Sequence, residues 1–337
     1  MSVWAKLLET AIHSPSPHNV QPWRVRIKND GEADLLIDSA RTLPREDPTG
    51  SFIILTMGMF IEALSLLAAE GKYRLEYELF HEPEWYRSAI LAAPGQVFLP
   101  FARLRLLSDQ KLAPAGNDPE IFLKRRTARI SLKAAPVAED AAAALKNVAG
   151  QWEQRYEQIT GAETIERILQ QDTRALFHDL NTSDYHDEIT SWFRFTDRSS
   201  LRHRDGLDYR CMNTSRLTYW LTAQFPLMMQ VPGLRLLLAR KYRRQTGVVP
   251  TIGILAGEFW PLSSALNTGR FLMRFWLETA RHNLYIHPFG NLVTNKQAAQ
   301  WMLEETKIPA IWLVFKIGYA DEPPKSYRRS VEEILLD

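Results

Sequence analysis

Apolar residues recur along the chain at two spacings, and the spacing predicts the kind of element. Residues 3–13 carry apolar side chains on one side of a helix, whereas residues 23–27 alternate apolar and basic side chains as a strand does. Residues 52–71 form an apolar segment long enough for a buried helix ending at Gly71. The other predicted strands are 33–38, 75–80, 102–107, 248–255 and 310–318, and the other predicted helices are 138–149, 165–180, 269–285 and one beginning at Ile121.

Turn-forming residues divide the chain near residue 118. Residues 114–119 gather Pro, Gly, Asn and Asp, so we predict a first domain of residues 1–118 and a second of residues 119–337. Residues 196–247 mix arginine-rich and apolar stretches and contain Pro226 and Pro232. We expect this segment to be an insertion that covers another part of the protein as a lid.

A weak internal similarity links the two predicted domains. Residues 56–64 resemble residues 267–275, and each stretch passes through a glycine into a long apolar helix. A turn at 71–73 or 283–285 and a later strand follow in each half. A tandem duplication explains this similarity, although two buried helices also resemble each other by chance.

Composition limits the classes of protein that fit. Hydrophobic residues make up 45% and charged residues 24% of 337 residues, which is typical of a soluble globular protein. The net charge of +2 gives no argument for a nucleic-acid partner. The single cysteine, Cys211, excludes a disulfide within the chain and a cysteine-rich metal site, and leaves a nucleophilic thiol as an alternative. No apolar run is expected to span a membrane and the N-terminus lacks a signal-peptide pattern, so we expect a cytoplasmic protein.

Four motifs carry residues suited to binding a ligand. Residues 14–23, Ser-Pro-Ser-Pro-His-Asn-Val-Gln-Pro-Trp, form a proline-braced loop, and residues 124–129, Lys-Arg-Arg-Thr-Ala-Arg, offer many donors for phosphate oxygens. Residues 286–291 include Gly290, which lets a backbone approach a ligand closely, and residues 324–329 carry further cations. Each motif has a plain alternative: a connecting loop, a solvated basic surface, a helix-ending turn and a solvated tail. Together they supply what a phosphorylated, flat, redox-active ring requires, and the glycine patterns of dinucleotide-binding and P-loop sites are absent.

Residues 14–23 resemble the Ser-Pro-Ser-x-x-Asn-x-Gln-Pro-Trp motif of the FMN-dependent nitroreductase family. Residues 124–129 resemble its Arg-Arg-Ser-x-Arg phosphate motif, and residues 269–291, 309–319 and 325–329 resemble its C-terminal half. Members of that family carry the arginine motif first and form homodimers with an FMN at each subunit interface. Here the order is reversed and each half lacks what the other has, which resembles the Acg-type branch, whose single chain mimics the dimer.

The resemblance implies an α+β, nitroreductase-like fold. It implies two tandem degenerate halves, each with a mixed β-sheet flanked by helices, that form an intramolecular pseudo-dimer with one FMN. The first half would contribute the loop, the second the basic residues and a backbone donor to the flavin, and no catalytic side chain or metal is expected. Arg194 and Arg198 are further, weaker candidates from the insertion. The implied cofactor-binding residues are Pro15, Ser16, Pro17, Asn19, Arg125, Arg126, Thr127, Arg129, Pro288, Phe289, Gly290, Asn291, Lys325, Arg328 and Arg329.

The resemblance further implies two-electron flavin chemistry on a small substrate, with NADPH or NADH as the electron donor. A monomeric pseudo-dimer or weak homodimer without nucleic-acid or membrane partners is expected. Three alternatives stay open. A lid-covered flavin would suit an FMN-sequestering or flavin-sensing protein without turnover. A flavin oxidase or dehydrogenase for one biosynthetic substrate is the second, and a basic binding module without flavin is the third.

Overall fold

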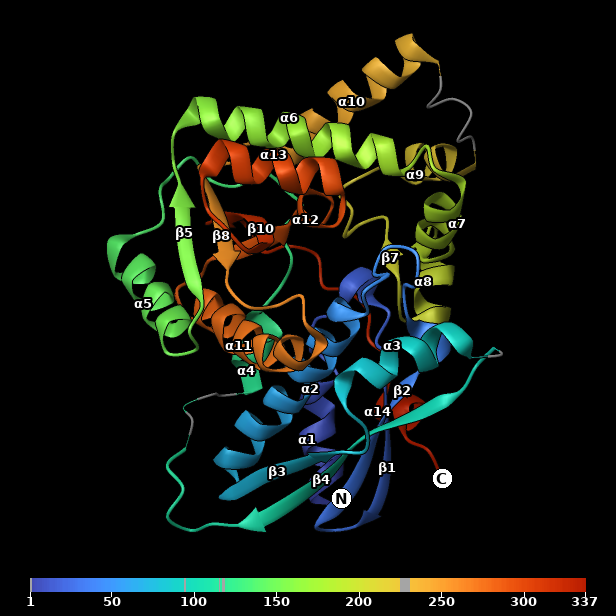
Figure 1. The fold of residues 1–337 in the computed structure, drawn as a ribbon, viewed down its shortest axis with the longest axis vertical. Helices are drawn as coiled ribbons and strands as arrows, with labels where there is room; N and C mark the ends of the chain where they lie inside the picture. The colour runs from blue at the N-terminus through green and yellow to red at the C-terminus, as the bar shows by residue number, and fades with distance from the viewer. Residues whose placement is uncertain (1, 94, 115, 117–118, 225–230) are drawn as a thin grey trace. The chain divides into compact units, whose positions relative to one another are not determined.

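The computed structural model describes residues 2–93, 95–114, 116, 119–224 and 231–337, which form two compact α+β units (Figure 1). Unit 1 comprises Met1–Lys124, Phe259–Leu277 and Tyr327–Asp337, and unit 2 comprises Arg125–Glu258 and Glu278–Ser326. Both units are discontinuous in sequence. The predicted division at residue 118 falls on Asp118, which lies outside the described residues, as does Pro226 of the insertion. The tandem division therefore stays a prediction.

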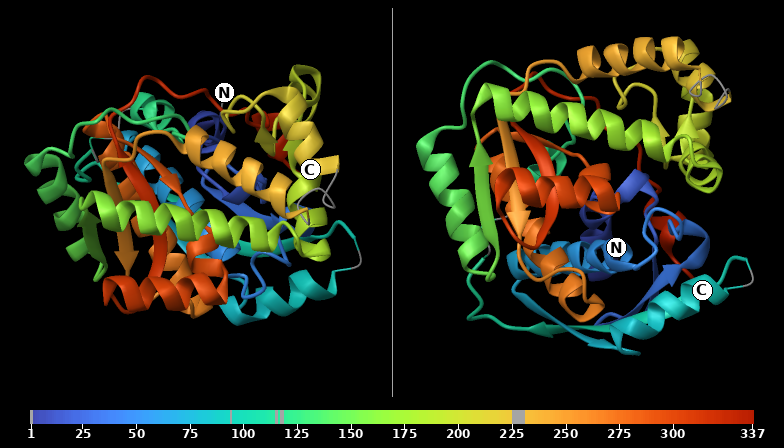
Figure 2. Two further views of the ribbon diagram at one scale, coloured as in Figure 1. Left: turned by 90° about the horizontal axis from the view of Figure 1, so that it is seen from above. Right: turned by 45° about the horizontal axis from the view of Figure 1, so that its top comes forward.

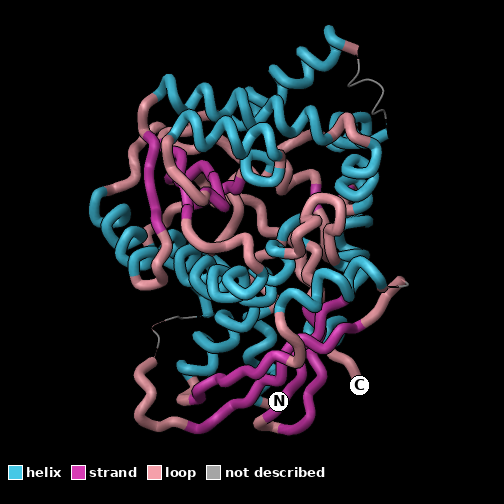
Figure 3. Tube along the Cα trace, in the orientation of Figure 1, coloured by secondary structure: helices cyan, strands magenta, loops and turns pink. Residues whose placement is uncertain are grey.

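Unit 1 contains an antiparallel sheet of order β1-β2-β4-β3 (Figure 3). The turn residues Asn29-Asp30-Gly31 predict a hairpin between strands 23–27 and 33–38, and the structure confirms it: β1 pairs with β2, and the Asn29 side chain accepts a hydrogen bond from the Gly31 N–H at 2.9 Å. The helices and strands of this unit are α1 (Val3–Ala11), β1 (Trp23–Asn29), β2 (Glu32–Asp38), α2 (Ser51–Glu70), β3 (Tyr73–Leu79), α3 (Pro83–Ala92), β4 (Phe98–Ser108), α4 (Pro119–Lys124), the part of α11 (Leu262–Arg281) up to Leu277, and α14 (Val331–Ile334).

The apolar helix α2 forms the centre of the unit 1 core. Phe60 of α2 stacks on Trp23 of β1 with ring centroids 4.7 Å apart, and both rings are fully buried. By length and composition α2 is long enough to cross a membrane, contrary to our expectation for the chain, but 89% of its most apolar window is buried within the protein. Such burial is typical of a core helix. Gly71 ends the helix as predicted, whereas Lys72, with φ of 61°, is the residue in the left-handed conformation.

Unit 2 contains a second antiparallel sheet, of order β5-β8-β10-β9. Helix α6 runs along α13 over this unit, as both views of Figure 2 show. The helices and strands are α5 (Glu139–Gly150), β5 (Arg155–Ile159), α6 (Ala162–Asp179), α7 (Ser183–Ser191), β6 (Phe193–Arg194), α8 (Asp197–His203), β7 (Leu207–Asp208), α9 (Arg216–Gln224), α10 (Pro232–Thr246), β8 (Thr251–Ala256), β9 (Tyr285–Pro288), α12 (Asn291–Thr294), α13 (Lys296–Thr306) and β10 (Ile311–Gly318).

The two four-stranded sheets share one strand order. Taken in chain order, the four strands of each sheet are arranged first, second, fourth, third, and a 20-residue helix, α2 or α11, joins the second strand to the third. Each helix is followed by a residue with positive φ, Lys72 or Asn283. The prediction of mixed sheets was wrong for these two four-stranded sheets, in which every pair of neighbouring strands is antiparallel. Within the described residues, parallel pairing occurs in the separate two-stranded sheet of β6 and β7 and at two isolated bridges, Val25 with Leu335 and Thr127 with Ile286.

Two glycines let α2 and the first part of α11 approach closely within unit 1. A Cβ added to Gly58 would lie 2.1 Å from the Leu266 carbonyl oxygen, and a Cβ added to Gly269 would lie 2.0 Å from the Leu55 carbonyl oxygen. Beside this crossing, the buried Glu62 carboxylate pairs with Arg270 at 2.8 Å and with Arg274. The crossing explains why both long helices carry a glycine near the middle of their apolar run.

Several boundaries differ from the sequence-based predictions. Helix α11 begins at Leu262 and ends at Arg281, so the predicted helix 269–285 was wrong at both ends and Tyr285 begins β9. Residues 196–247 hold three helices in their described part, α8, α9 and α10, which no clear periodicity predicted. Helices α3 and α13 and strand β5 were also missed.

Candidate functional site

The proline-braced loop of unit 1 holds a strained backbone. His18, Asn19 and Gln21 have φ values of 46°, 56° and 53°, a conformation that residues other than glycine rarely adopt. The Ser16 hydroxyl accepts a hydrogen bond from the Gln21 N–H at 3.0 Å and so closes the loop. The His18 imidazole pairs with Glu46 at 3.1 Å. Strain of this kind persists only where the surroundings enforce it, which is common at binding sites.

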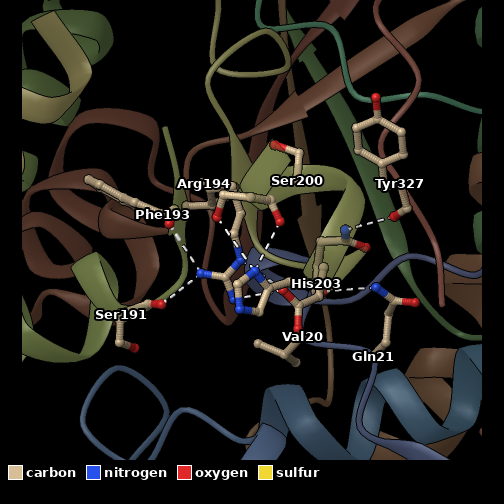
Figure 4. A network of polar contacts seen from close by, with 12 residues as sticks. Val20, Gln21, Ser191, Phe193, Arg194, Ser200, His203 and Tyr327 are labelled. Atoms are coloured by element: carbon tan, nitrogen blue, oxygen red, sulfur yellow. Dashed lines mark hydrogen bonds and ion pairs between the residues drawn. The ribbon is translucent and has the colours of Figure 1, made fainter. Parts of the chain in front are cut away.

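The loop binds the C-terminal segment of the chain. The Asn19 side-chain amide donates to the Tyr327 carbonyl at 3.0 Å, and the buried Gln21 side chain accepts from the Arg329 N–H at 2.9 Å. Figure 4 shows Gln21 and Tyr327 in this network. The Arg329 guanidinium is buried and donates to the Glu333 carbonyl, whereas the half-buried Arg328 donates to the Tyr327 carbonyl at 3.0 Å. Two predicted motifs, the loop and the C-terminal cations from Arg328 onward, therefore lie together in unit 1.

The arginine motif lies along strand β9 in unit 2. Thr127 forms a parallel bridge with Ile286, and the Ala128 N–H donates to the Ile286 carbonyl at 3.0 Å. This pairing brings Arg125, Thr127 and Arg129 beside the segment that continues into residues 288–291. Two further predicted motifs, separated by about 160 residues in sequence, thus become neighbours through one strand edge.

The three arginines of this motif have different surroundings. Arg126 is held away from a ligand role, because its guanidinium donates to the Pro323 carbonyl at 2.7 Å and pairs with Glu322 at 2.6 Å. Arg125 is 6% exposed. Arg129 is half-buried, and within the described part of the chain its side chain forms no hydrogen bond or ion pair. An arginine removed from water without a carboxylate favours an anion at that position.

Two further basic residues, Lys316 and His287, interact electrostatically with Arg129, and neither is among the cofactor-binding residues that the resemblance implies. Lys316 of β10 is fully buried, and its ammonium donates to the Ile130 carbonyl at 2.7 Å and the Thr246 carbonyl at 2.9 Å. Burial, followed by the charges of Arg129 and Arg243, lowers the pKa of Lys316 to about 7. Burial, followed by the charges of Arg129 and Lys316, lowers the pKa of His287 well below its usual value. A lysine inside the apolar run 310–318 was the sequence signal that marks this cluster.

The turn after β9 presents open backbone donors. The Phe289 N–H donates to the Val314 carbonyl at 2.8 Å, whereas the N–H groups of Gly290 and Asn291 find no acceptor among the residues that the structure describes. A Cβ added to Gly290 would meet nothing within 4 Å, and its φ of −55° suits any residue. The Asn291 side chain is committed to Asp179 at 2.8 Å. Local folding therefore does not require glycine at 290, but a ligand lying against the backbone would.

The insertion is tied to the arginine motif by hydrogen bonds within unit 2. The Asn213 side chain donates to the Gln245 carbonyl at 3.3 Å and the Arg129 carbonyl at 3.5 Å. Arg194, a weak candidate ligand, is buried, pairs with Asp205 and donates to the carbonyls of Ser191 and Phe193, so its role is to fold the insertion (Figure 4). Arg198, the other weak candidate, is exposed on α8.

Cys211 and Lys325 complete the set of candidate residues in unit 2. The Cys211 thiol is buried 3.6 Å from the Ser326 hydroxyl, and burial raises its pKa, which opposes a nucleophilic thiolate. Lys325 is exposed. The structure thus gathers Arg125, Thr127, Arg129 and residues 288–291 in unit 2, and Asn19 with Arg328 and Arg329 in unit 1.

Comparison with models of known families gives no match, and comparison with curated proteins gives none. Among solved structures, the chain is similar to FMN-dependent nitroreductase NfnB from Mycobacterium smegmatis in complex with NADPH, with 16% identity over 64% of this chain and 94% of that chain and a TM-score of 0.40. It is also similar to the FMN and NADPH-dependent nitroreductase NfnB from Sphigopyxis sp. strain HMH, with 15% identity over 65% and 96% and a TM-score of 0.38.

A nitroreductase with bound FMN from Bacteroides fragilis NCTC 9343 is similar at 13% identity over 62% of this chain and 91% of that chain, with a TM-score of 0.32. These three structures are nitroreductases that depend on FMN or contain it.

Proposed function

We propose that this chain binds one FMN and uses it as a nitroreductase-like oxidoreductase. The observation that carries the proposal is the pairing of Thr127 and Ala128 with Ile286. It places an arginine without a carboxylate partner and a turn with two open amides on the same edge of the unit 2 sheet. A phosphorylated flat ring needs both features.

The phosphate and ribityl chain of FMN suit the arginine motif. Arg129 is half-buried without an anionic partner, and Arg125 lies on the same stretch of chain. Guanidinium groups bind phosphate oxygens through paired, charge-assisted hydrogen bonds. Thr127 adds a hydroxyl between them, whereas Arg126 is already bound to Glu322 and Pro323 and would act by fixing the loop.

The isoalloxazine ring suits the turn at 288–291. Pro288 and Phe289 would line the ring, and the N–H of Gly290 or Asn291 would donate to a ring nitrogen. The open space at Gly290 fits a flat ligand lying on the backbone. His287 adds a buried Nδ1 with no hydrogen-bond partner among the described residues.

Bound FMN would supply two-electron chemistry, accepting a hydride from NADPH or NADH and passing the electrons to a small substrate. The residues of the chain bind and orient the ring and supply a positive environment. Arg129, with a contribution from Lys316, would provide that positive environment beside the site. No side-chain nucleophile is needed.

The proposal extends to a tandem arrangement of two degenerate halves acting as a pseudo-dimer. The shared strand order of the two sheets and the paired glycines of α2 and α11 support a duplication. Pro15, Ser16, Pro17 and Asn19 of the first half, and Lys325, Arg328 and Arg329 of the second, stay candidates for cofactor binding. Their assignment rests on the motif resemblance. A cytoplasmic protein that is monomeric or a weak homodimer stays our expectation.

One observation favours a second candidate, an FMN-sequestering or flavin-sensing protein without NAD(P)H turnover. The end of the insertion is fixed to the arginine motif through Asn213, and Lys316 binds the carbonyl of Thr246 at the end of α10. A lid fastened in this way would exclude a nicotinamide from the flavin.

An absorption spectrum of the purified protein, recorded before and after anaerobic addition of NADPH or NADH, tests both candidates. Flavin bands that bleach support the oxidoreductase. Flavin bands that persist with both donors, but bleach with dithionite, support sequestration. A protein without flavin bands that also takes up no added FMN would refute both.

A further inference from the structure

The insertion in unit 2 concentrates exposed apolar side chains. Six of the twelve exposed large hydrophobic residues of the described chain lie in residues 196–247. On α10, Leu236 and Leu237 are 51% and 60% exposed, and on α9 Leu217 is 66% exposed. Apolar groups gathered in one segment are typical of an interaction surface, whereas single exposed leucines are not.

The same segment is strongly basic. From residue 216 to residue 247 the sequence holds six Arg or Lys and no Asp or Glu, although the whole chain has a net charge of only +2. Arg235, Arg240 and Arg244 of α10 are exposed, and within the described residues their side chains form no ion pair. Lys241, also exposed, donates to the Thr218 hydroxyl at 2.7 Å.

The inner side of α10 fixes the orientation of its outer side. Leu238, Ala239 and Tyr242 pack against the cluster of Phe177, Leu180 and Ile189. Tyr242 donates to Asp172 of α6 at 3.0 Å, and Arg243 pairs with Glu166 of the same helix. Helical spacing therefore directs Leu237, Arg240 and Arg244 away from α6, because they lie on the opposite side from Tyr242.

Most of the basic residues of α10 follow its exposed leucines along the helix. Leu236 and Leu237 lie near the N-terminal end of α10, which projects beyond α6 at the top of Figure 1, and Arg240, Lys241 and Arg244 follow toward the C-terminal end. Leucines at a projecting end can enter the headgroup region of a bilayer, while the cations contact lipid phosphates. The phosphates of a nucleic acid would bind the cations but would not bury the leucines.

We propose that α9 and α10 dock this protein reversibly on an anionic phospholipid surface. Leu236, Leu237 and Leu217 enter the interface, and Arg240, Lys241 and Arg244 bind lipid phosphates. This replaces the expectation of no membrane partner, which considered spanning segments and not attachment to a membrane surface. The proposal is independent of the proposed FMN site.

Flotation with vesicles tests the proposal on the full chain. Vesicles of phosphatidylcholine mixed with phosphatidylglycerol should carry the protein upward, and vesicles of phosphatidylcholine alone should carry much less. R240Q/R244Q should lower binding to the anionic vesicles on the order of 30-fold. L236S/L237S should lower binding to the anionic vesicles roughly tenfold. Added salt should weaken the binding that this variant retains. The matched controls K146Q and L91S change exposed residues of α5 and α3 and should bind as the parent does.

Four results would overturn the proposal. One is absence of binding to anionic vesicles. The second is equal loss of binding in the controls. The third is binding to a short DNA duplex that is as tight as vesicle binding and insensitive to L236S/L237S. The fourth is self-association in light scattering that L236S/L237S abolishes while vesicle binding is unchanged, which would assign the surface to a second copy. Circular dichroism of each variant shows whether it is folded.

Discussion

Gly58 of α2 and Gly269 of α11 occupy equivalent positions in one helix crossing, each against the backbone of the other helix. Gly58 faces the carbonyl of Leu266, and Gly269 faces the carbonyl of Leu55. Leu55 and Leu266 each precede their own glycine by three residues, so the contact is reciprocal. Reciprocal contacts are what a two-fold axis produces between identical surfaces. This crossing is the most specific structural support for a duplicated chain.

Both glycines should be intolerant of any side chain. In G58A or G269A the new methyl group would overlap a carbonyl oxygen, and the helices would have to separate. We expect each variant to lower the free energy of unfolding by about 3 kcal/mol. Thermal and urea unfolding measure this. The matched control is G150A in α5, where a Cβ meets nothing within 4 Å and stability should be unchanged or higher. A tolerated alanine at either position would contradict the crossing.

The sequence predicted most elements of unit 1, and the errors made at α11 have physical reasons. Residues 52–71 and the Asn29-Asp30-Gly31 turn are strong local signals, so α2 and the β1–β2 hairpin were predicted correctly. The predicted start of helix α11 lay too far along the chain, because its first turn at Leu262–Ser264 has no marked periodicity. The assignment of its first part to unit 1 depends on packing against α2, which is a long-range effect that no local pattern encodes.

The sequence motifs identified residues of the candidate site but not the role of each residue. The motif 124–129 was found, whereas the difference between Arg126, bound to Glu322, and Arg129, bound to no acidic group of the described chain, depends on residues about 200 positions apart. Lys316 was read as part of an apolar strand, and only the fold shows that its ammonium meets two carbonyls beside Arg129. Tertiary contacts, which sequence spacing does not contain, set these roles.

Arg129 should be required for flavin binding but not for folding. R129Q removes a charge-assisted contact to FMN, and we expect roughly 10- to 100-fold weaker binding. The apoprotein should be as stable as the parent or more stable, because a half-buried cation without a partner opposes folding. Fluorescence titration with FMN and thermal unfolding of the apoprotein measure the two effects. The control R155Q changes an exposed arginine of β5. Unchanged FMN affinity in R129Q would refute the assignment.

A substitution at Gly290 should lower FMN affinity while leaving the stability of the apoprotein nearly unchanged. Its backbone conformation suits any residue and its surroundings are open, so G290V should leave the melting temperature of the apoprotein nearly unchanged. A branched side chain would stand where the flat ring is proposed to lie. We expect FMN affinity to fall by about 100-fold or more, since the ring could no longer reach the backbone donor. Equal FMN binding by G290V and the parent would place the ring elsewhere.

Asp172 should make stability depend on pH. It is 2% exposed, and burial raises its pKa from 3.8 to about 7, although Tyr242 donates a hydrogen bond to it. Between these two values the folded state holds a proton that the unfolded state has lost, so stability falls as pH rises toward 7 and then levels off. The parent should lose about 2 kcal/mol relative to D172N between pH 5 and pH 8.

Urea unfolding at both pH values measures this difference. The control D140N changes an exposed carboxylate of α5 and should follow the parent at both pH values. A D172N variant whose stability runs parallel to that of the parent from pH 5 to pH 8 would show that Asp172 is already ionised at pH 5 in the folded protein.

Gln21 should hold the C-terminal segment in place. Its side chain is fully buried, accepts from the Arg329 N–H at 2.9 Å and donates to the Asn19 carbonyl at 3.2 Å. Leucine has a similar size but satisfies neither group, so Q21L should lower stability by about 3 kcal/mol. In Q21L, the rate of backbone amide hydrogen exchange should increase first at residues 327–337, which Gln21 anchors directly. The control Q170L changes an exposed glutamine of α6. If exchange in Q21L rose uniformly across the β1-β2-β4-β3 sheet instead, Gln21 would stabilise the core of unit 1 rather than the segment that carries Arg328.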